Sequence, residues 1–374
     1  MPDSLYRINA DRNKPWNDLP PLPLDERLYK TVEVLEQLGQ AKLALGRLQG
    51  RGVAIPNQGM LVNTISLQEA KASSAIENIF TTDDDLYKAY SEQHQEMSGP
   101  SKEVLYYREA LWSGYEYLKK SDFDLDYLIR MYRTVKQASD GIRPPFAQIV
   151  IRRGSRGPQA GQVIYTPPRG KDILEKKLFN LLEYINDDEQ YPADPLLKMA
   201  IAHFQFEAIH PFRDGNGRAG RIFNIHYLTK KGLLDQPVLF LSRYIIENKA
   251  DYYDYLAGVS QRGDWENWVL YMLKAVEVTA NITYQKINDI IATRDAMLEV
   301  LEKETDIRRP EQLLLAIFTQ PLTKVKHLTD AGFYAENTAR NYLNTLSEIG
   351  VLEKKSIGGH YYYLNQELYR ILAE

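Results

Sequence analysis

Hydrophobic positions recur at helical spacing along most of this chain, which predicts a mainly α-helical protein. Near the N-terminus, one stripe runs through Leu28, Val32, Leu35 and Leu38 and predicts a helix over residues 25–50. The same spacing predicts further helices over residues 64–79, 102–119, 124–138, 171–186, 195–209, 218–231, 248–261 and 264–292. The expected fold class is therefore a helical bundle with few strands.

Proline and glycine interrupt this helical pattern. Residues 13–24 are rich in proline and are predicted to be extended, because proline fixes φ and cannot donate a backbone hydrogen bond. Residues 141–170 are rich in both residue types and contain two short runs with β propensity, 148–152 and 162–166, joined by a glycine-rich connection. This arrangement predicts a β-hairpin within a helical region.

The end of the chain has a different pattern. After a linker predicted at residues 308–310, two short helices are joined by a turn near Gly332. Strand patterns follow on either side of Gly358 and Gly359. A helix, a turn, a longer helix and a hairpin are typical of a winged helix-turn-helix unit, which is predicted over residues 308–374.

Composition narrows the setting. The chain has 44% hydrophobic and 26% charged residues, which suits a globular protein with a core of normal size. A net charge of -4 gives no general attraction to nucleic acid or anionic membrane. Cysteine is absent, which excludes disulfides, thiol catalysis and cysteine-bound metals and is consistent with the cytoplasm. No apolar run approaches the ~20 residues of a membrane span, so no membrane partner is expected.

The segment HPFRDGNGRAGR, residues 210–221, combines groups that suit the binding of phosphate. It lies between two predicted helices, so its last residues form a first helical turn, where free N–H groups and the helix dipole favour anions. Gly215 and Gly217 allow backbone amides to approach a ligand closely. Arg218 and Arg221 lie three positions apart, which places them on one face of that helix.

Two side chains of the same segment supply further chemistry. Asp214 is a hard oxygen ligand of the kind that Mg²⁺ takes alongside substrate phosphates. His210 accepts a proton near neutral pH. A base, a metal ligand, a set of backbone amides and paired arginines together indicate nucleotidyl transfer.

This segment matches, at every fixed position, the H-P-F-x-D-G-N-G-R-x-x-R signature of Fic domain proteins, and the chain resembles that family over residues 100–290. The resemblance implies a protein adenylyltransferase, which uses ATP and Mg²⁺ to transfer AMP to a Ser, Thr or Tyr hydroxyl of a target protein and releases pyrophosphate. It also implies an N-terminal helical region at residues 1–100 and a Fic catalytic domain at residues 101–295, before the winged unit.

The resemblance implies a role for each signature residue. His210 would be the general base that deprotonates the target hydroxyl, and Asp214 would hold Mg²⁺. Arg218 would neutralise charge on the leaving pyrophosphate, Arg221 would hold the γ-phosphate, and the Asn216 side chain would add a donor. The backbone amides that would cradle the phosphates belong to Gly215, Asn216, Gly217, Ala219 and Gly220.

A second motif lies upstream, in the segment SSAIEN of the helix predicted at residues 64–79. Ser73 and Glu77 are four positions apart and therefore share a face. Fic proteins carry an inhibitory motif, [S/T]-x-x-x-E-[G/N], on a helix before the domain, and Ser73, Glu77 and Asn78 fit it. The resemblance implies that Glu77 pairs with Arg221 and occupies the space of the γ-phosphate. A carboxylate and a phosphate compete for the same guanidinium, so ATP would bind weakly or in the wrong pose.

Two further sites follow from the resemblance. Asn248, Tyr252 and Tyr253 are expected to line the adenine pocket. The predicted hairpin resembles the family's flap, which pairs with the backbone of the target protein. Its docking residues are expected to be Val163, Ile164, Tyr165 and Thr166.

The sequence leaves the partner of the winged unit open. Residues 323–360 carry an excess of only one positive charge, and the expected recognition helix holds Glu336, Arg340 and Glu348, a weak footprint for nucleic acid. Docking to another protein, or formation of a homodimer, is as consistent with this pattern as DNA binding.

Two other functions of the chain also stay open: a DNA-binding regulator that only senses nucleotide, and a hydrolase that removes AMP from a modified protein.

Overall fold

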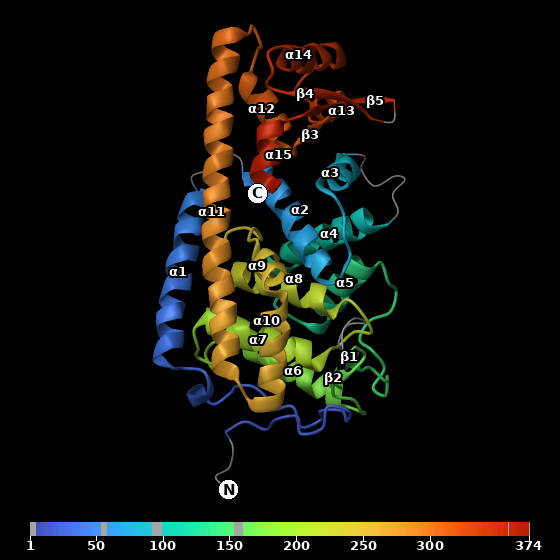
Figure 1. Ribbon diagram of the computed structural model, residues 1–374, viewed down its shortest axis with the longest axis vertical. Helices are drawn as coiled ribbons and strands as arrows, with labels where there is room; N and C mark the ends of the chain where they lie inside the picture. The colour runs from blue at the N-terminus through green and yellow to red at the C-terminus, as the bar shows by residue number, and fades with distance from the viewer. Residues whose placement is uncertain (1–4, 54–57, 92–98, 153–159, 358, 374) are drawn as a thin grey trace.

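The computed structural model describes residues 5–53, 58–91, 99–152, 160–357 and 359–373, and most of them are helical (Figure 1). The helices are η1 (Glu26–Leu28), α1 (Val32–Val53), α2 (Gln58–Ile76), α3 (Asp83–Ser91), α4 (Pro100–Leu118), α5 (Leu125–Lys136), α6 (Ile173–Asn186), α7 (Pro195–Ile209), α8 (Asn216–Lys230), α9 (Leu241–Glu247), α10 (Lys249–Arg262), α11 (Trp265–Glu304), α12 (Pro310–Thr319), α13 (Val325–Asp330), α14 (Glu336–Glu348) and α15 (Gln366–Ala373). The strands are β1 (Ile151–Arg152), β2 (Val163–Tyr165), β3 (Leu322–Thr323), β4 (Glu353–Ile357) and β5 (His360–Leu364). The predicted mainly helical fold class is confirmed.

Helices α7 and α8 form the centre of the fold, and the loop 210–215 joins them. Nearly every side chain of both helices is buried, because α4, α5, α6 and α11 pack around them. Trp265 of α11 packs edge-to-face on Phe204, with ring centroids 4.8 Å apart. Trp268 donates a hydrogen bond from Nε1 to the Ala200 carbonyl at 2.8 Å. This packing fixes the end of α7 in the middle of the molecule.

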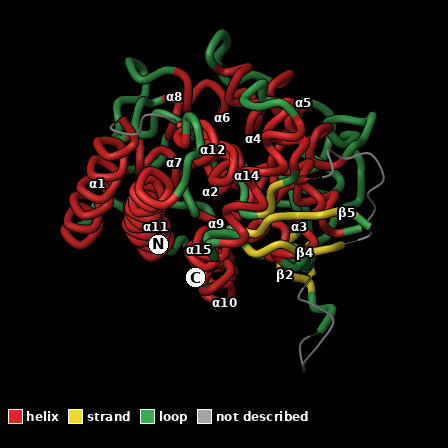
Figure 2. The backbone as a smooth tube through the Cα atoms, turned by 90° about the horizontal axis from the view of Figure 1, so that it is seen from above, coloured by secondary structure: helices red, strands yellow, loops and turns green. Residues whose placement is uncertain are grey.

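Helix α1 differs from its prediction in start and in face. It begins at Val32 rather than near residue 25, because the chain before it forms only the short η1. Val32 and Leu35 are exposed, and the buried stripe passes through Val34 and Leu38 instead. That stripe packs along α11, and the two helices lie side by side at one edge of the molecule in both views (Figures 1 and 2).

Some helix boundaries also differ from the prediction. Helix α8 starts at Asn216 rather than at residue 218, and α9 was not predicted. Helix α11 continues to Glu304, well beyond residue 292, and the helix as a whole packs against α12 and α15. Despite this length, α11 does not have the apolar composition of a membrane span, and neither does any other helix in the described part of the chain.

The predicted hairpin is present but short. Ile151 pairs with Tyr165 and Arg152 with Val163, with an irregularity of register between the two pairs. Most of the glycine-rich connection lies outside the described residues. The Tyr165 hydroxyl donates to the Ala208 carbonyl at 2.8 Å, which attaches β2 to the end of α7. The hairpin is therefore held beside the loop that follows α7.

The C-terminal unit has the predicted winged helix-turn-helix order. Helices α13 and α14 are the two short helices, β4 and β5 form the hairpin, and the strand order of the sheet is β3-β5-β4. Of the two glycines expected in the hairpin turn, Gly358 lies outside the described residues. Helices α12 and α15 complete the unit and pack against α2 and α11, so α14 and the hairpin lie at the far end of the molecule (Figure 1).

Candidate active site

The loop between α7 and α8 depends on two residues with left-handed backbone. His210 ends α7 with φ 52° and ψ 61°, and its N–H donates to the Phe206 carbonyl at 3.0 Å. Gly215, with φ 76°, directly precedes α8. Glycine adopts this conformation without steric cost, which allows the helix to start abruptly. The first N–H groups of α8, which have no acceptor within the helix, are therefore available at the cavity described below.

The loop is braced from inside by Asn216. Its side-chain Oδ1 accepts a hydrogen bond from Phe212 N, and its Nδ2 donates to Phe212 O, both at 2.9 Å. The Phe212 ring is buried and stacks on Tyr132, with centroids 4.2 Å apart. The Asn216 side chain is thus engaged in holding the loop, and the expectation that it donates to phosphate stays a prediction.

Arg143, which the sequence did not point to, supports the loop from outside. Its backbone N–H donates to the Pro211 carbonyl at 2.9 Å. The buried guanidinium donates to the carbonyls of His210 at 2.7 Å, Pro168 at 2.6 Å and Ile209 at 3.2 Å. These bonds join the segment before β1 to the end of α7 and fix the position of His210.

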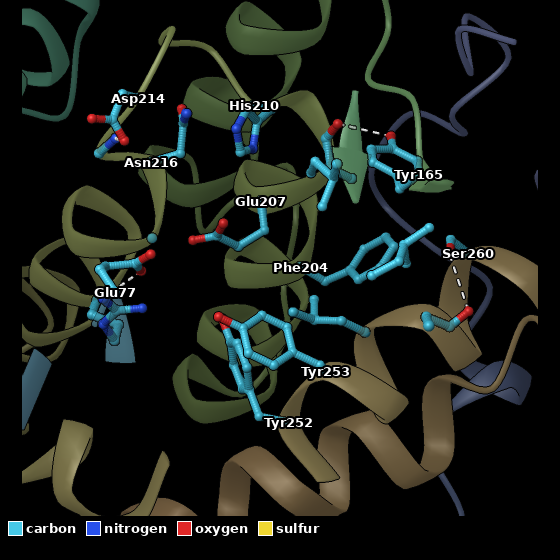
Figure 3. Close-up of a pocket in the computed structure, with 18 of the residues that line it drawn as sticks. Glu77, Tyr165, Phe204, Glu207, His210, Asp214, Asn216, Tyr252, Tyr253 and Ser260 are labelled. Carbon is cyan, nitrogen blue, oxygen red and sulfur yellow. Dashed lines mark hydrogen bonds and ion pairs between the residues drawn. The ribbon is translucent and has the colours of Figure 1, made fainter. Parts of the chain in front are cut away.

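A cavity of about 320 Å³ lies between this loop, the hairpin, α7, α10 and the end of α2 (Figure 3). That volume is within the range of small-molecule sites. The predicted site residues that line it are His210, Asp214, Gly215, Asn216, Gly217, Arg221, Tyr252, Tyr253, Glu77, Ile164 and Tyr165. The fold therefore gathers residues from distant parts of the chain around one space.

His210 and Glu207 point into the cavity from the last turn of α7 (Figure 3). Burial and the nearby Arg143 guanidinium lower the pKa of His210 to about 4, so its imidazole is neutral at pH 7. Within the described part of the chain, its Nδ1 has no hydrogen-bond partner, and neither has Oε1 of Glu207. Burial raises the pKa of Glu207 to about 8. Sequence reasoning missed Glu207, although its place three residues before His210 on one helix face was a usable signal.

Arg221 is buried and bonded to the end of α2 at three points. Its Nε donates to Ser73 Oγ at 2.8 Å, and a terminal nitrogen donates to the Ser73 carbonyl and to Glu77 Oε1, both at 2.9 Å. Burial disfavours the charge on Arg221, but the Glu77 carboxylate holds the Arg221 pKa above its ordinary value. The structure thus brings together the residues of the two motifs.

The Glu77 carboxylate also lies against the first turn of α8. A Cβ on Gly217 would overlap Glu77 Oε1, so this approach requires glycine. Glu77 therefore places an anion at a helix N-terminus, which is a favourable position for phosphate as well. Asn78 follows with φ 62°. Lys249, which was not predicted, lies nearby and donates from Nζ to the Ile76 carbonyl at 2.6 Å.

Asp214 is exposed at the edge of the cavity. Its Oδ2 accepts from Lys136 Nζ at 2.6 Å, and its Oδ1 accepts from the Gly215 N–H at 2.7 Å. Desolvation acts to raise the pKa of Asp214, but these hydrogen bonds hold it below the ordinary value. An ionised carboxylate suits Mg²⁺, which takes one or two carboxylates together with substrate phosphates. Clusters of three or more His, Cys, Asp or Glu side chains that could hold a metal ion are absent from the described residues.

Several predicted site residues do not line the cavity. Arg218 is buried and pairs with Glu103 of α4 at 3.0 Å, so Arg218 and Arg221 leave α8 toward different partners rather than toward one ligand. Asn248 donates from its side chain to the Tyr244 carbonyl at 2.9 Å, because it joins α9 to α10. The other predicted residues outside the lining are Ser73, Asn78, Val163, Thr166, Ala219 and Gly220.

The end of the cavity away from Arg221 is less polar. Leu256, Ala257 and Ser260 follow Tyr253 on one face of α10, and Phe204 contributes from α7 (Figure 3). The spacing of three, four and seven residues after Tyr253 was the available sequence signal. A flat apolar group therefore fits this end and an anion fits the other.

Sequence profiles match three successive parts of the chain. The profile described as Fic/DOC family N-terminal matches residues 35–116, and the Fic/DOC family profile matches residues 122–228. The profile described as protein adenylyltransferase SoFic-like, C-terminal domain, matches residues 293–368. The last match includes the end of α11 as well as the winged unit.

Curated relatives carry related names at modest identity. Protein adenylyltransferase fic-1 of Caenorhabditis elegans is 27% identical over 161 residues, which are 42% of this chain and 28% of that protein. Protein adenylyltransferase Fic of Aedes aegypti is 26% identical over 263 residues, 69% of this chain and 47% of that protein. This chain therefore spans less than half the length of these relatives.

Solved structures share the fold. A Fic family protein from Desulfovibrio desulfuricans G20 superposes with a TM-score of 0.55 and 22% identity, covering 92% of this chain and 98% of that one. A Fic domain containing signaling protein from Bacteroides thetaiotaomicron VPI-5482 gives a TM-score of 0.53 at 14% identity, covering 67% of this chain and 97% of that one. From its profiles, its relatives and its fold, this chain belongs to the Fic/DOC family.

Proposed function

We propose that this chain is a protein adenylyltransferase that transfers AMP from ATP to a Ser, Thr or Tyr hydroxyl of a target protein and releases pyrophosphate. The observation that carries the proposal is the neutral imidazole of His210, which faces the same cavity as the N-terminus of α8 and the Arg221 guanidinium. A proton acceptor beside an anion site is what this transfer requires. Relatives named protein adenylyltransferases match 42% and 69% of this chain.

On this proposal, the shape of the cavity orients the nucleotide. The triphosphate lies against the backbone of residues 215–217, and the base lies at the less polar end beside Tyr253 and Leu256. Asp214 would hold Mg²⁺, which neutralises charge on the phosphates. His210 takes the proton from the target hydroxyl as its oxygen bonds to the α-phosphorus, and the bond from that phosphorus to pyrophosphate breaks.

The contact between Glu77 and Arg221 would keep this enzyme restrained. Glu77 holds the guanidinium that the γ-phosphate needs and occupies space beside Gly217. ATP must therefore displace a carboxylate before its phosphates can reach the productive position. The Glu77 carboxylate at the end of α2 thus acts as an internal competitor of ATP, and it competes for Arg221 through its negative charge.

The hairpin would receive the target. Ile164 and Tyr165 of β2 line the cavity, and β1 and β2 pair only with each other in the described part of the sheet. A target segment that adds its backbone to an edge of this hairpin would bring a hydroxyl toward His210. Side chains of the hairpin would then influence which targets are accepted.

Three variants test the proposal with α-labelled ATP, Mg²⁺ and cell lysate, read by intact-mass analysis for AMP adducts on the enzyme or on a lysate protein. We expect Glu77→Gly to raise AMP incorporation roughly tenfold or more, since a hydrogen bond to a charged group contributes about 1.5–3 kcal/mol. Glu77→Gln keeps the shape of the side chain but not its charge, and is expected to give an intermediate increase. The double variant Glu77→Gly with His210→Ala is expected to form no adduct.

Each outcome has a separate meaning. Absence of any adduct from Glu77→Gly, although ATP binds, would refute adenylyl transfer. Equal activity of Glu77→Gly and the unmodified protein under excess ATP would refute inhibition by Glu77. Release of AMP from a modified target in a reaction that requires Glu77 would identify a hydrolase instead.

A further inference from the structure

A groove of about 490 Å³ crosses the free face of the winged unit, remote from the cavity of the candidate active site. It is formed by the start of α13, the exposed side of α14 and the β4–β5 hairpin. The residues that line it are Lys324, Val325, Lys326, Thr329, Glu336, Arg340, Asn344, Lys354, Gly359, His360, Tyr361 and Tyr363. Basic and aromatic side chains make up much of this lining.

The fold separates charges that nearly cancel in the sequence. Lys324, Lys326, Arg340 and Lys354 all line the groove, and Glu336 is the one carboxylate among its lining residues in the described chain. Glu336 already accepts a hydrogen bond from Arg340 at 2.6 Å within α14. The groove is therefore strongly positive, although the segment as a whole has an excess of only one positive charge.

The other acidic residues of the segment lie elsewhere. Asp330 and Glu348 are outside the groove lining. Glu353 is also outside it and bonds to Gln366 at 2.8 Å, with Lys355 3.4 Å away. The charge balance read from sequence thus underestimates the potential on this face, because the balance ignores where the side chains point.

Aromatic rings hold the lysines in place. Lys354 Nζ lies 4.5 Å from the centroid of the Tyr361 ring and donates to Asn344 Oδ1 at 2.8 Å. Lys324 Nζ lies 4.4 Å from the Tyr362 centroid. Such cation–π contacts reduce the freedom of the lysine side chains before any ligand binds. Tyr361 itself is 59% exposed.

The opposite face of the unit is the one that docks onto the rest of the protein. Helices α12 and α15 and strand β3 pack against α2, α11 and α3, while α14 lies on the outside (Figure 1). On α14, the exposed side chains Asn337, Arg340 and Asn341 recur at positions i, i+3 and i+4. Amide and guanidinium groups at such positions match the hydrogen-bonding edges of bases in a major groove.

We propose that this face binds double-stranded DNA. Lys324, Lys326 and Lys354, which line one groove beside α14, contact backbone phosphates, and α14 enters the major groove with Arg340 and Asn341 toward the base edges. The length of α14, about 20 Å, and the width of a major groove, about 12 Å, are compatible with this arrangement. The groove shares no residue with the cavity near His210, so DNA binding can be tested without adenylyl transfer.

The test uses the full chain and a fluorescein-labelled DNA duplex of about 20 base pairs, with anisotropy measured from about 50 to about 200 mM NaCl. We expect binding whose logarithmic affinity falls linearly with the logarithm of salt concentration. The triple variant Lys324→Ala, Lys326→Ala, Lys354→Ala is expected to bind at least roughly tenfold more weakly and to have a salt slope shallower by about 3.

A matched triple variant controls for net charge. It removes three exposed lysines from the other end of the molecule, by the substitutions Lys14→Ala, Lys171→Ala and Lys176→Ala. The affinity of this variant for the duplex is expected to stay within about twofold of that of the unmodified protein. Arg340→Glu provides a second test in the groove, since its side chain is about half exposed and its loss leaves the core intact. Thermal unfolding checks that each variant is folded.

Three results would overturn the proposal. One is the absence of duplex binding by the unmodified protein at the lowest salt concentration. Another is equal affinity for the groove variants, including Arg340→Glu, and the matched lysine control. The third is single-stranded DNA of the same length binding as tightly as the duplex, because α14 could not then be reading a major groove.

Discussion

Arg221 is the residue on which the state of the candidate active site depends. Its guanidinium is buried, and a buried charge that loses its partner costs several kcal/mol. In the structure the Glu77 carboxylate is that partner, and on the proposed function the γ-phosphate replaces it. Arg221 is thus paired in both states, which makes exchange between them possible without a large penalty.

Ser73 offers a graded test of this exchange. Ser73→Ala removes the hydroxyl that accepts from Arg221 Nε but leaves the Ser73 carbonyl and Glu77 in place. We therefore expect the KM for ATP to fall. At low ATP concentration, the rate of AMP incorporation should rise by less than it does in Glu77→Gly, and by less than roughly 100-fold. The initial rate of AMP incorporation against ATP concentration measures this.

Ser74 supplies the matched control. It is the neighbour of Ser73 and is also buried, but its hydroxyl has no hydrogen-bond partner among the residues that the structure describes. Ser74→Ala is expected to leave the KM for ATP unchanged. Identical kinetics for the two alanine variants would remove Ser73 from the inhibitory contact.

The predicted site residues that the structure places at the cavity are those whose position follows from local spacing. His210 and Asp214 reach the cavity because they belong to one loop, and Glu77 reaches it because it directly follows the end of α2. Arg218 lies outside the cavity lining and pairs with Glu103 of another helix, 115 positions away, so its expected role at the pyrophosphate stays a prediction. Glu207 was missed although its place three residues before His210 was a local signal, and only the assembled core shows that its carboxyl is buried.

At the scale of elements, the end of α2 determines where Glu77 lies. The helix stops at Ile76, and the Ile79 N–H bonds back to the Ser74 carbonyl at 3.0 Å. Asn78 makes this turn possible with φ 62°, a conformation that glycine and asparagine adopt most readily. The preference of the inhibitory motif for Gly or Asn after the glutamate thus has a backbone explanation.

Substitutions at Asn78 test this explanation. Asn78→Gly keeps the left-handed turn, so we expect inhibition to persist and basal AMP incorporation to stay low. Asn78→Val adds a β-branched side chain, for which the left-handed conformation costs about 1–2 kcal/mol. We expect this cost to shift the end of α2 and so to raise basal AMP incorporation. Both are measured as AMP incorporation without a change at Glu77. If the valine variant is as inactive as the glycine variant, the turn does not position Glu77.

Helical periodicity predicted most of the fold's helices but could not choose between neighbouring faces. In α1, Val32, Val34, Leu35 and Leu38 are all apolar, so two overlapping stripes fit the same segment. Packing against α11 selects the stripe with Val34, and that contact is invisible to a local pattern. The same reason explains why the short α9, α12 and α15 were not predicted: each is defined by what it packs against.

At the scale of the whole molecule, helix α2, which positions Glu77, is held from several sides. Helix α2 packs against α4 and α9 of the catalytic region and against α12 and α15 of the C-terminal unit. A helix of this length has little stability alone in water, so the position of its end depends on these neighbours. The state of the candidate active site is therefore a property of the full chain.

Buried ionisable groups also couple the whole fold to pH. Burial lowers the pKa of His203 to about 3 and of His210 and His226 to about 4. Below the ordinary histidine pKa of 6.5, the unfolded chain therefore binds protons that the folded protein does not, and the free energy of unfolding decreases as pH falls. Burial raises the pKa of Glu69 to about 7 and of Glu207 to about 8. The folded protein keeps both carboxyls protonated above the ordinary glutamate pKa of 4.5, where the unfolded chain has already released these protons. The free energy of unfolding therefore decreases as pH rises.

Glu207→Gln isolates the second effect. We expect the unfolding free energy of the unmodified protein to fall between about pH 6.5 and 8, and to fall less steeply in Glu207→Gln, by up to about 1.4 kcal/mol per pH unit, the contribution of one proton. Urea unfolding followed by tryptophan fluorescence measures this in the catalytic region, since all four tryptophans precede the winged unit. Glu175→Gln, exposed on α6, is the matched control and keeps the original slope. An unchanged slope in Glu207→Gln would mean that this carboxyl is already ionised in the folded protein and cannot hold a proton at neutral pH.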